Sequence, residues 1–579
     1  MKKAKLSVLI LPCLLMLSNA LYGQGPELAE IERISKSGET LGPELAAQFP
    51  LREQRIANDT GINVLIDLSH QANFFTMWNL PKMLRRWGFR ACGSQASLDT
   101  VLTPGQLSRV RISVGGRRPF AWWPNPLYNV VITFQADPRA QDYLPEEVEG
   151  LKEYVRSGGG LVILGSRVSK REDIEKWPLN KLAGQFGAGF SSDADTLDGV
   201  TMPVLNLSSG WEVCRSGVEG KPVLARCEWE KGRVLIVGSS RYLESMKDES
   251  SDSSTPESQG AAFVAELITW AAGGSPPAGG EARLPTEASG GGPIYPELTQ
   301  RIGNVVVYYA RNQKAELLEC ITRDMPLVKS KVEGWLPSVA PDEPMNLILS
   351  AGGGGGWAVN AYLPKEVGII SLTKQGVLSV FAHELAHTMG GPPNDEGKLA
   401  GNWPDGNQGE AHAGWFQGKA AALPTGKRVS HEPNKLFDFD KEGNAFDLAL
   451  PDSQNREKWG KGKDWTKIWW VWQKLDDRYG PTWYPRWRWV QHTRWKHQPD
   501  RRLSWDETVE DMSIAVGEDL FPFFRKIGTT LDKERFERAV FEGKTIPLPV
   551  APLEVTAAGP VRLEPIGDYR EPIAVGALP

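Results

Sequence analysis

Three residues near the middle of the chain have the types and spacing of a metal site. His383, Glu384 and His387 lie in the stretch FAHELAHTMGGPP and form the pattern H-E-x-x-H. At about 100° per residue, the two histidines lie roughly 40° apart on one face of a helix, so both imidazoles can bind one metal ion. Glu384 lies at the edge of that face and can take a proton from water. With 7 histidines in 579 residues, chance is a poor explanation for this spacing. We therefore predict one zinc ion, with His383 and His387 as ligands and Glu384 as the catalytic base.

A catalytic zinc ion needs a third protein ligand. Position 393 is a proline, which excludes the longer motif that would place a third histidine there. Glu396 lies in a segment of turn composition, whereas Glu410 begins the helix-compatible run EAHAGWFQGKAAAL. A second helix packed beside the first can aim a carboxylate at the same metal. We predict Glu410 as the third ligand, and Glu396 and His412 remain the alternatives.

The elements around this site are predicted from hydrophobic periodicity. The histidine pair belongs to a predicted helix over residues 374–389, whose other side carries apolar residues. The strands predicted before it are NVVVYYA, MNLILSA and EVGIISL. Downstream, residues 458–490 are rich in tryptophan. Aromatic rings can stack on sugars, but the helical spacing of Ile468, Trp472 and Leu475 favours core packing.

The first half of the chain alternates predicted strands with predicted helices. Apolar strands are expected at Ile62–Ser69, Asn129–Phe134 and Leu161–Gly165, and amphipathic helices lie between them. Continuous apolar strands joined by helices indicate a parallel sheet covered on both faces. Residues 275–293 are rich in Gly, Pro and Ser and are predicted to be a linker.

Composition and the first residues restrict the class of protein. A net charge of −5 argues against a nucleic-acid partner. Residues 1–20 combine a positive start, a short apolar stretch and the sequence Ser-Asn-Ala, so we expect a signal peptide cleaved after Ala20. No later segment is apolar for long enough to be a transmembrane helix. We expect a secreted or periplasmic protein with a lead-in over residues 21–60.

Four cysteines follow the predicted cleavage site, without C-x-x-C spacing. Cys214 and Cys227 lie in a predicted hairpin. They can pair across it in an oxidising compartment or remain free buried thiols, and the sequence leaves both possibilities open.

The second half of the chain resembles a known family. HELAH followed by Glu410 after 22 intervening residues is similar to the enhancin-like zinc metallopeptidases of the M-sixty family, which includes viral enhancins and bacterial mucin-degrading proteases. The closing stretch DETVEDMSIAVGEDLFPFFRKIGTTL, residues 506–531, also resembles this family. The resemblance implies a zincin peptidase domain over residues 294–545, followed by a tail over residues 546–579. It also implies protein or glycoprotein substrates such as mucins.

Residues 61–274 resemble class I glutamine amidotransferase-like domains in the stretches LKEYVRSGGGLVILG and KGRVLIVGSSRYL. That fold implies a nucleophilic cysteine on a tight turn, but here Ser166 follows the strand, and His70 is the only histidine of the block. We expect a non-catalytic accessory domain without glutaminase activity.

Together these patterns predict a multidomain chain with a flavodoxin-like α/β domain followed by an α+β zincin metallopeptidase domain. The predicted activity is that of a secreted zinc endopeptidase. The alternative is a non-catalytic secreted protein that binds glycans or proteins on a degenerate zincin scaffold.

Overall fold

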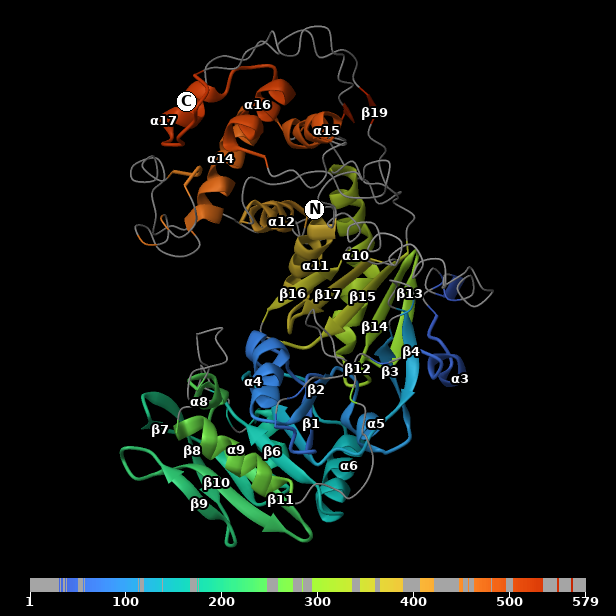
Figure 1. The fold of residues 1–579 in the computed structure, drawn as a ribbon, viewed down its shortest axis with the longest axis vertical. Helices are drawn as coiled ribbons and strands as arrows, with labels where there is room; N and C mark the ends of the chain where they lie inside the picture. Colours follow the sequence, from blue (N-terminus) through green and yellow to red (C-terminus); the bar gives the residue numbers. More distant parts are fainter. Residues whose placement is uncertain are drawn as a thin grey trace, which may run out of the picture. The chain divides into compact units, whose positions relative to one another are not determined.

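The computed structural model describes most of residues 31–166, 174–246, 259–273, 294–335, 344–388, 407–420, 463–495 and 503–534, together with a few residues outside these ranges, among them Leu284, residues 447–450 and two short strands at 549–550 and 564–565. The predicted signal peptide, Glu396 and most of the predicted tail lie outside the described residues. The chain divides into two compact units (Figure 1). Unit 1 comprises residues 1–314 and 344–372, and unit 2 comprises residues 315–343 and 373–579.

A ten-stranded sheet with the order β4-β3-β12-β2-β1-β5-β6-β11-β10-β9 lies at the centre of unit 1. Strands β2, β1, β5, β6 and β11 pair in parallel, whereas the outer pairs β3·β4, β10·β11 and β9·β10 are antiparallel. The strands are β1 (Asn63–Asp67), β2 (Arg90–Ser94), β3 (Leu107–Arg111), β4 (Phe120–Pro124), β5 (Val130–Phe134), β6 (Gly160–Leu164), β9 (Glu212–Ser216), β10 (Pro222–Trp229), β11 (Gly232–Val237) and β12 (Ile294–Tyr295). The predicted α/β architecture with a parallel sheet is confirmed.

Helices cover both faces of this sheet, as expected for parallel strands whose two faces are both buried. Every residue of β1, β5 and β6 is buried. One core packs these strands against α4 and α9, and a second core packs them against α5, α6 and α7. Figure 1 shows α4, α5, α6 and α9 beside the sheet. The helices of unit 1 are α3 (Pro43–Ala46), η1 (Phe75–Asn79), α4 (Leu80–Arg86), α5 (Leu98–Leu102), α6 (Pro145–Arg156), α7 (Pro178–Gly184), α8 (Ser240–Glu244) and α9 (Gln259–Ala271). A separate hairpin is formed by β7 (Ala188–Leu197) and β8 (Val200–Leu207).

A second sheet in unit 1 has the order β13-β14-β15-β17-β16. Its strands are β13 (Leu298–Ile302), β14 (Val305–Tyr309), β15 (Met345–Ser350), β16 (Gly355–Val359) and β17 (Lys365–Ile370). Polar contacts tie it to the ten-stranded sheet. Gln95 donates from Nε2 to Ser350 Oγ at 2.8 Å, and Arg111 pairs with Glu366.

The predicted domain boundaries at residues 274 and 294 both lie inside unit 1. Leu284, within the predicted linker, is buried in the same core as α6. Strand β12 pairs with both β2 and β3. It thereby satisfies backbone groups that would otherwise stay unpaired at the edges of those two strands.

Unit 2 is built mainly from helices: α10 (Ala315–Trp335), α11 (Lys374–Thr388), α12 (Asn407–Ala420), α14 (Lys463–Tyr479), α15 (Trp483–Trp495), α16 (Trp505–Val516) and α17 (Phe521–Lys526). A short strand pair joins β18 (Pro549–Val550) to β19 (Glu564–Pro565). Ile468, Trp472 and Leu475 are buried on α14, which confirms that the helical spacing in the tryptophan-rich segment reports core packing. Within the described part of the chain, no helix is long and apolar enough to cross a membrane.

Candidate metal centre

Helix α11 presents both histidines of the H-E-x-x-H pattern on one face. The apolar residues on its other side, among them Val377, Phe381 and Leu385, are fully buried and fix the helix in unit 2. The Nε2 atoms of His383 and His387 lie 3.1 Å apart. About a fifth of each imidazole side chain is exposed. The predicted helix therefore brings two ring nitrogens to one point that solvent can reach.

Helix α12 brings Glu410 to the same point. Its Oε2 atom lies 3.3 Å from His383 Nε2, and its Oε1 atom lies 3.5 Å from His387 Nε2. Without a metal ion, hydrogen bonds donated by the Nε2 atoms of the two imidazoles hold the pKa of the Glu410 carboxyl far below its usual range, and a bound metal ion would take the place of those protons. Glu410 is therefore an ionised carboxylate placed against both histidines.

The geometry of the three side chains fits a single metal ion. Their ligand atoms all lie within 4.8 Å of one another. Ligand atoms on a tetrahedral zinc ion with bonds of about 2.0–2.1 Å lie about 3.3 Å apart. The 3.1 Å separation of the two Nε2 atoms is close to that edge length, and the two carboxylate oxygens of Glu410 lie 3.3 and 3.5 Å from these atoms, one oxygen facing each ring. Two imidazoles and one carboxylate are also a donor set that leaves a fourth position for water or substrate.

Glu384 differs from Glu410 in its surroundings. Its side chain is buried, and burial raises the pKa of its carboxyl to about 7. The nearby His383 partly opposes this rise, whereas the negative charge of Glu410 adds to it. Glu384 can therefore gain and lose a proton near neutral pH, as a base for proton transfer requires.

The structure gives His412, one of the two alternative ligands, a different role. His412 is buried, and its Nε2 atom lies 3.2 Å from the backbone oxygen of Ala386. That contact makes Nε2 a donor, so Nδ1 accepts a hydrogen bond from the hydroxyl of Tyr484. Because both ring nitrogens form hydrogen bonds, His412 links α12 to α11 and α15 and has no free lone pair with which to bind a metal ion.

Contacts with α14 fix the position of α12. Trp469 donates from Nε1 to the backbone oxygen of Ala411 at 2.6 Å. A Cβ atom at Gly414 would lie 2.2 Å from the Trp469 ring, so glycine is needed for this close approach. The tryptophan-rich segment therefore supports the helix that carries Glu410.

Two further residues lie beside His383 that the sequence analysis did not identify. His383 Nδ1 lies 3.1 Å from Gln417 Oε1, and Gln417 donates from Nε2 to Ser379 Oγ at 2.6 Å. Their spacing in the sequence could have identified them. Ser379 precedes His383 by four residues and Gln417 follows Glu410 by seven, so each pair lies on one side of its helix.

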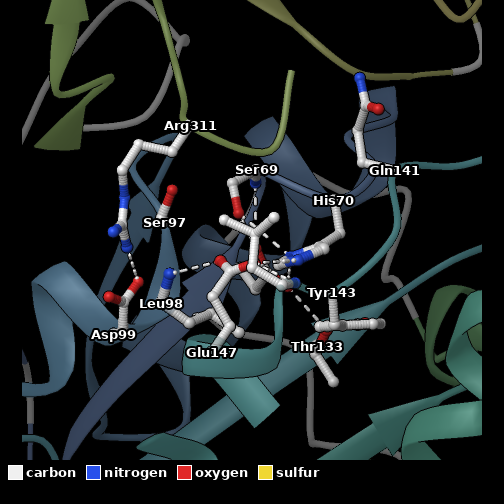
Figure 2. Close-up of polar contacts among 12 residues, drawn as sticks. Ser69, His70, Ser97, Leu98, Asp99, Thr133, Gln141, Tyr143, Glu147 and Arg311 are labelled. Carbon is white, nitrogen blue, oxygen red and sulfur yellow. Dashed lines mark hydrogen bonds and ion pairs between the residues drawn. The ribbon is translucent and has the colours of Figure 1, made fainter. Parts of the chain in front are cut away.

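In unit 1, His70 lies in a buried ionic cluster at the carboxyl end of β1 (Figure 2). Its Nδ1 atom lies 2.8 Å from Asp67 Oδ2, and its Nε2 atom lies 3.2 Å from Glu147 Oε2. The ring stacks on Tyr143 with centroids 3.8 Å apart. Burial disfavours the charged imidazole, but the two carboxylates outweigh it and raise the pKa of His70 to about 10. His70 is therefore held between two acids, of which Glu147 also caps the start of α6 by accepting a hydrogen bond from the backbone N–H of Leu144.

Cys214 and Cys227 are both free thiols. Cys214 lies on β9 opposite the irregular pairing at Leu224 and Ala225, whereas Cys227 lies beyond Arg226, which pairs with Glu212. The hairpin is confirmed, but its register does not place the two cysteines opposite each other.

Comparisons with known proteins leave the family of this chain open. No family model and no curated protein matches it. Among solved structures, a cytoplasmic protein of Salmonella typhimurium LT2 is 14% identical, with 36% of this chain and 99% of that chain covered and a TM-score of 0.23. A ThuA-like protein of Parabacteroides merdae is 11% identical, with 40% and 97% covered and a TM-score of 0.21. An exo-β-1,4-mannosidase of an Opitutaceae bacterium is 13% identical, with 35% of each chain covered and a TM-score of 0.21. These low TM-scores support no statement about fold or activity.

Proposed function

We propose that the chain is a zinc-dependent endopeptidase in which His383, His387 and Glu410 hold one zinc ion. The observation that carries the proposal is the convergence of the two Nε2 atoms and the Glu410 carboxylate at separations of 3.1–3.5 Å. The buried Glu384, one residue from His383, adds the base that hydrolysis requires.

Each residue has a defined part in the proposed reaction. A zinc ion held by His383, His387 and Glu410 would act as a Lewis acid, which would polarise a peptide carbonyl and lower the pKa of bound water toward neutrality. Glu384 accepts a proton from the attacking water and then donates it to the leaving amine. Burial raises the pKa of the Glu384 carboxyl, and the charge of a bound zinc ion would lower it again, which leaves Glu384 a carboxylate that can accept the proton. Glu410, with its depressed pKa, stays ionised throughout and serves as a ligand.

The resemblance to enhancin-like peptidases extends the proposal to the substrate and the location. We propose glycosylated proteins of the mucin type as substrates and export as the route to them. The second candidate function is a binding protein on a degenerate zincin scaffold. The intact base favours the enzyme, because binding alone does not require a buried carboxyl next to the metal ligands.

A digest tests the proposal directly. Purified protein is incubated with a mixture of glycosylated and unglycosylated proteins, with a chelator, without it, and with zinc restored after chelation. We expect cleavage that the chelator abolishes and zinc restores, and no cleavage by the Glu384→Gln variant. Bound zinc without cleavage of any substrate would favour the binding protein, and absence of zinc from the purified protein would refute both the metal site and the peptidase.

A further inference from the structure

Helix α12 faces the histidines of α11 with two polar side chains. Glu410 and Gln417 are seven residues apart, so they lie on the same side of α12 two turns apart. Glu410 contacts His383 and His387, whereas Gln417 contacts His383 and Ser379. The two helices therefore run in opposite directions at this contact, and Gln417 reaches the side of the His383 ring that is turned away from Glu410.

The contacts of Gln417 define the orientation of its amide. Its Nε2 atom donates to Ser379 Oγ at 2.6 Å, and Ser379 is buried. Its Oε1 atom lies 3.1 Å from His383 Nδ1. An amide oxygen has no hydrogen to donate, so this contact is a hydrogen bond only if His383 carries its proton on Nδ1.

The proton on Nδ1 decides what the other ring nitrogen can do. A neutral imidazole has one N–H and one lone pair, and a free imidazole populates both tautomers. With the proton on Nδ1, the lone pair lies on Nε2, which is the atom that faces His387 Nε2 and Glu410. The hydrogen bond also fixes the rotation of the ring about its side-chain bonds.

From these contacts we propose that Gln417 is a positioning residue for the metal: it holds His383 in the tautomer and orientation that present Nε2, and Ser379 holds Gln417. This inference rests on the proposed zinc site. Partners that accept a hydrogen bond from a metal-binding histidine typically contribute about 10- to 100-fold to metal affinity.

Variants of the full-length protein separate this role from simple packing. Gln417→Met keeps a side chain of similar length but removes the acceptor. Gln417→Glu keeps an acceptor and cannot donate, so it enforces the same tautomer. Ser379→Ala removes the partner that orients the amide. Gln473→Met is the matched control, because the Gln473 amide donates to Asp477 on an exposed part of α14.

The readout is the zinc dissociation constant of metal-stripped protein, measured by competition with a chromophoric chelator. The absorption spectrum of the cobalt-substituted protein checks that the ligand set is unchanged. We expect Gln417→Met to weaken zinc binding about 10- to 100-fold with the cobalt spectrum preserved. Ser379→Ala should weaken it less, and both Gln417→Glu and Gln473→Met should bind zinc at least as tightly as the wild type.

The following results would contradict the inference. Wild-type affinity in both Gln417→Met and Ser379→Ala would show that the hydrogen bond does not position His383, while the zinc site itself would stand. Equal weakening by Gln417→Glu and Gln417→Met would show that packing, and not the acceptor, is what matters. If Gln417→Met fails to fold, the zinc affinities of Gln417→Glu and Ser379→Ala are compared with that of the wild type. Weaker binding by Ser379→Ala with wild-type binding by Gln417→Glu would support the inference, and wild-type binding by Ser379→Ala would contradict it. A wild-type protein that binds no zinc would refute the proposed function together with this inference.

Discussion

Two glutamates near the same histidines have opposite electrostatic environments. Burial raises the pKa of Glu384 to about 7, whereas hydrogen bonding to His383 and His387 lowers that of Glu410 far below its usual range. One carboxyl is therefore suited to carry a proton and the other to remain charged beside a cation. Their loss should have different consequences.

We predict that Glu384→Gln keeps zinc and loses turnover by about 10²- to 10⁴-fold, because the shape is retained and the base is removed. Glu410→Ala should lose zinc itself, because one of three ligands is gone. Elemental analysis and a peptidase assay on both variants measure the two effects. Glu396→Ala is the control and should retain zinc. His412→Ala should weaken zinc binding less than Glu410→Ala, because it removes a contact between α12 and α11 but no ligand. Loss of zinc in Glu396→Ala or His412→Ala with full zinc in Glu410→Ala would show that Glu410 is not the third ligand.

His70 gives unit 1 a dependence on pH. Its pKa is about 10 in the folded protein, because Asp67 and Glu147 outweigh the cost of burying its charge, and about 6.5 when unfolded. The folded pKa is raised, so the stabilisation is fully present below about pH 6.5 and is lost as the pH rises toward 10. We predict that the free energy of unfolding falls over this range by an amount on the order of a few kcal/mol.

Urea unfolding of the full-length protein at pH 6.5, 8.0 and 9.5 measures this loss, and His70→Gln should lack the part due to the histidine. Because that variant leaves two buried carboxylates unpaired and can fold poorly, a second measurement uses the wild type. The NMR chemical shifts of the His70 ring should stay those of a charged imidazole from pH 6.5 to pH 8.5. A transition near pH 6.5 would contradict the prediction.

At the scale of the elements, the metal site depends on how closely α12 approaches α14. Gly414→Ala places a Cβ atom 2.2 Å from the Trp469 ring and forces the helices apart. We predict a loss of about 1–3 kcal/mol in stability, as is typical of overpacked cores. Zinc affinity should fall as well, because Glu410 is carried on α12.

Thermal unfolding and the zinc dissociation constant of Gly414→Ala test this prediction. Gly184→Ala is the control, since a Cβ atom there meets nothing within 4 Å and a helix gains from alanine. A Gly414→Ala protein with wild-type melting and wild-type zinc affinity would show that the helix contact has no effect on the site.

The glycine run at residues 352–356 is another case in which an element depends on a close approach. Composition favours a mobile loop there, but Gly355 and Gly356 belong to β16 and Gly352 forms an isolated bridge with Ala72. A Cβ atom at Gly352 would lie 2.3 Å from the backbone oxygen of Ala72. Glycine is required there by packing within unit 1, which the local sequence does not reveal.

At the scale of the whole molecule, β12 decides where a stable fragment can end. A fragment of residues 61–274 lacks this strand and leaves the facing edges of β2 and β3 unpaired. We predict that a fragment of residues 31–314 unfolds at a higher urea concentration than the shorter one, and that neither releases ammonia from glutamine. Equal midpoints would mean that β12 contributes nothing to the sheet. Glutaminase activity in either fragment would refute the non-catalytic interpretation of this region.

What the sequence determined by itself was local. The spacing of His383 and His387 placed two imidazoles on one helix face, because helix geometry is the same wherever a helix forms. Continuous apolar runs such as Val130–Phe134 predicted buried parallel strands for the same reason, since a strand covered on both faces has no polar side.

What only the tertiary structure decided was which distant residues meet. Spacing could not choose among Glu396, Glu410 and His412, because each lies within reach of the histidines along the chain. The packing of α12 on α11 brings Glu410 to both Nε2 atoms and leaves His412 bonded to Tyr484 and Ala386. The partnership of Gln417 with His383 and the place of β12 in the first sheet have the same physical origin. Both depend on contacts between segments far apart in the sequence, which no local pattern records.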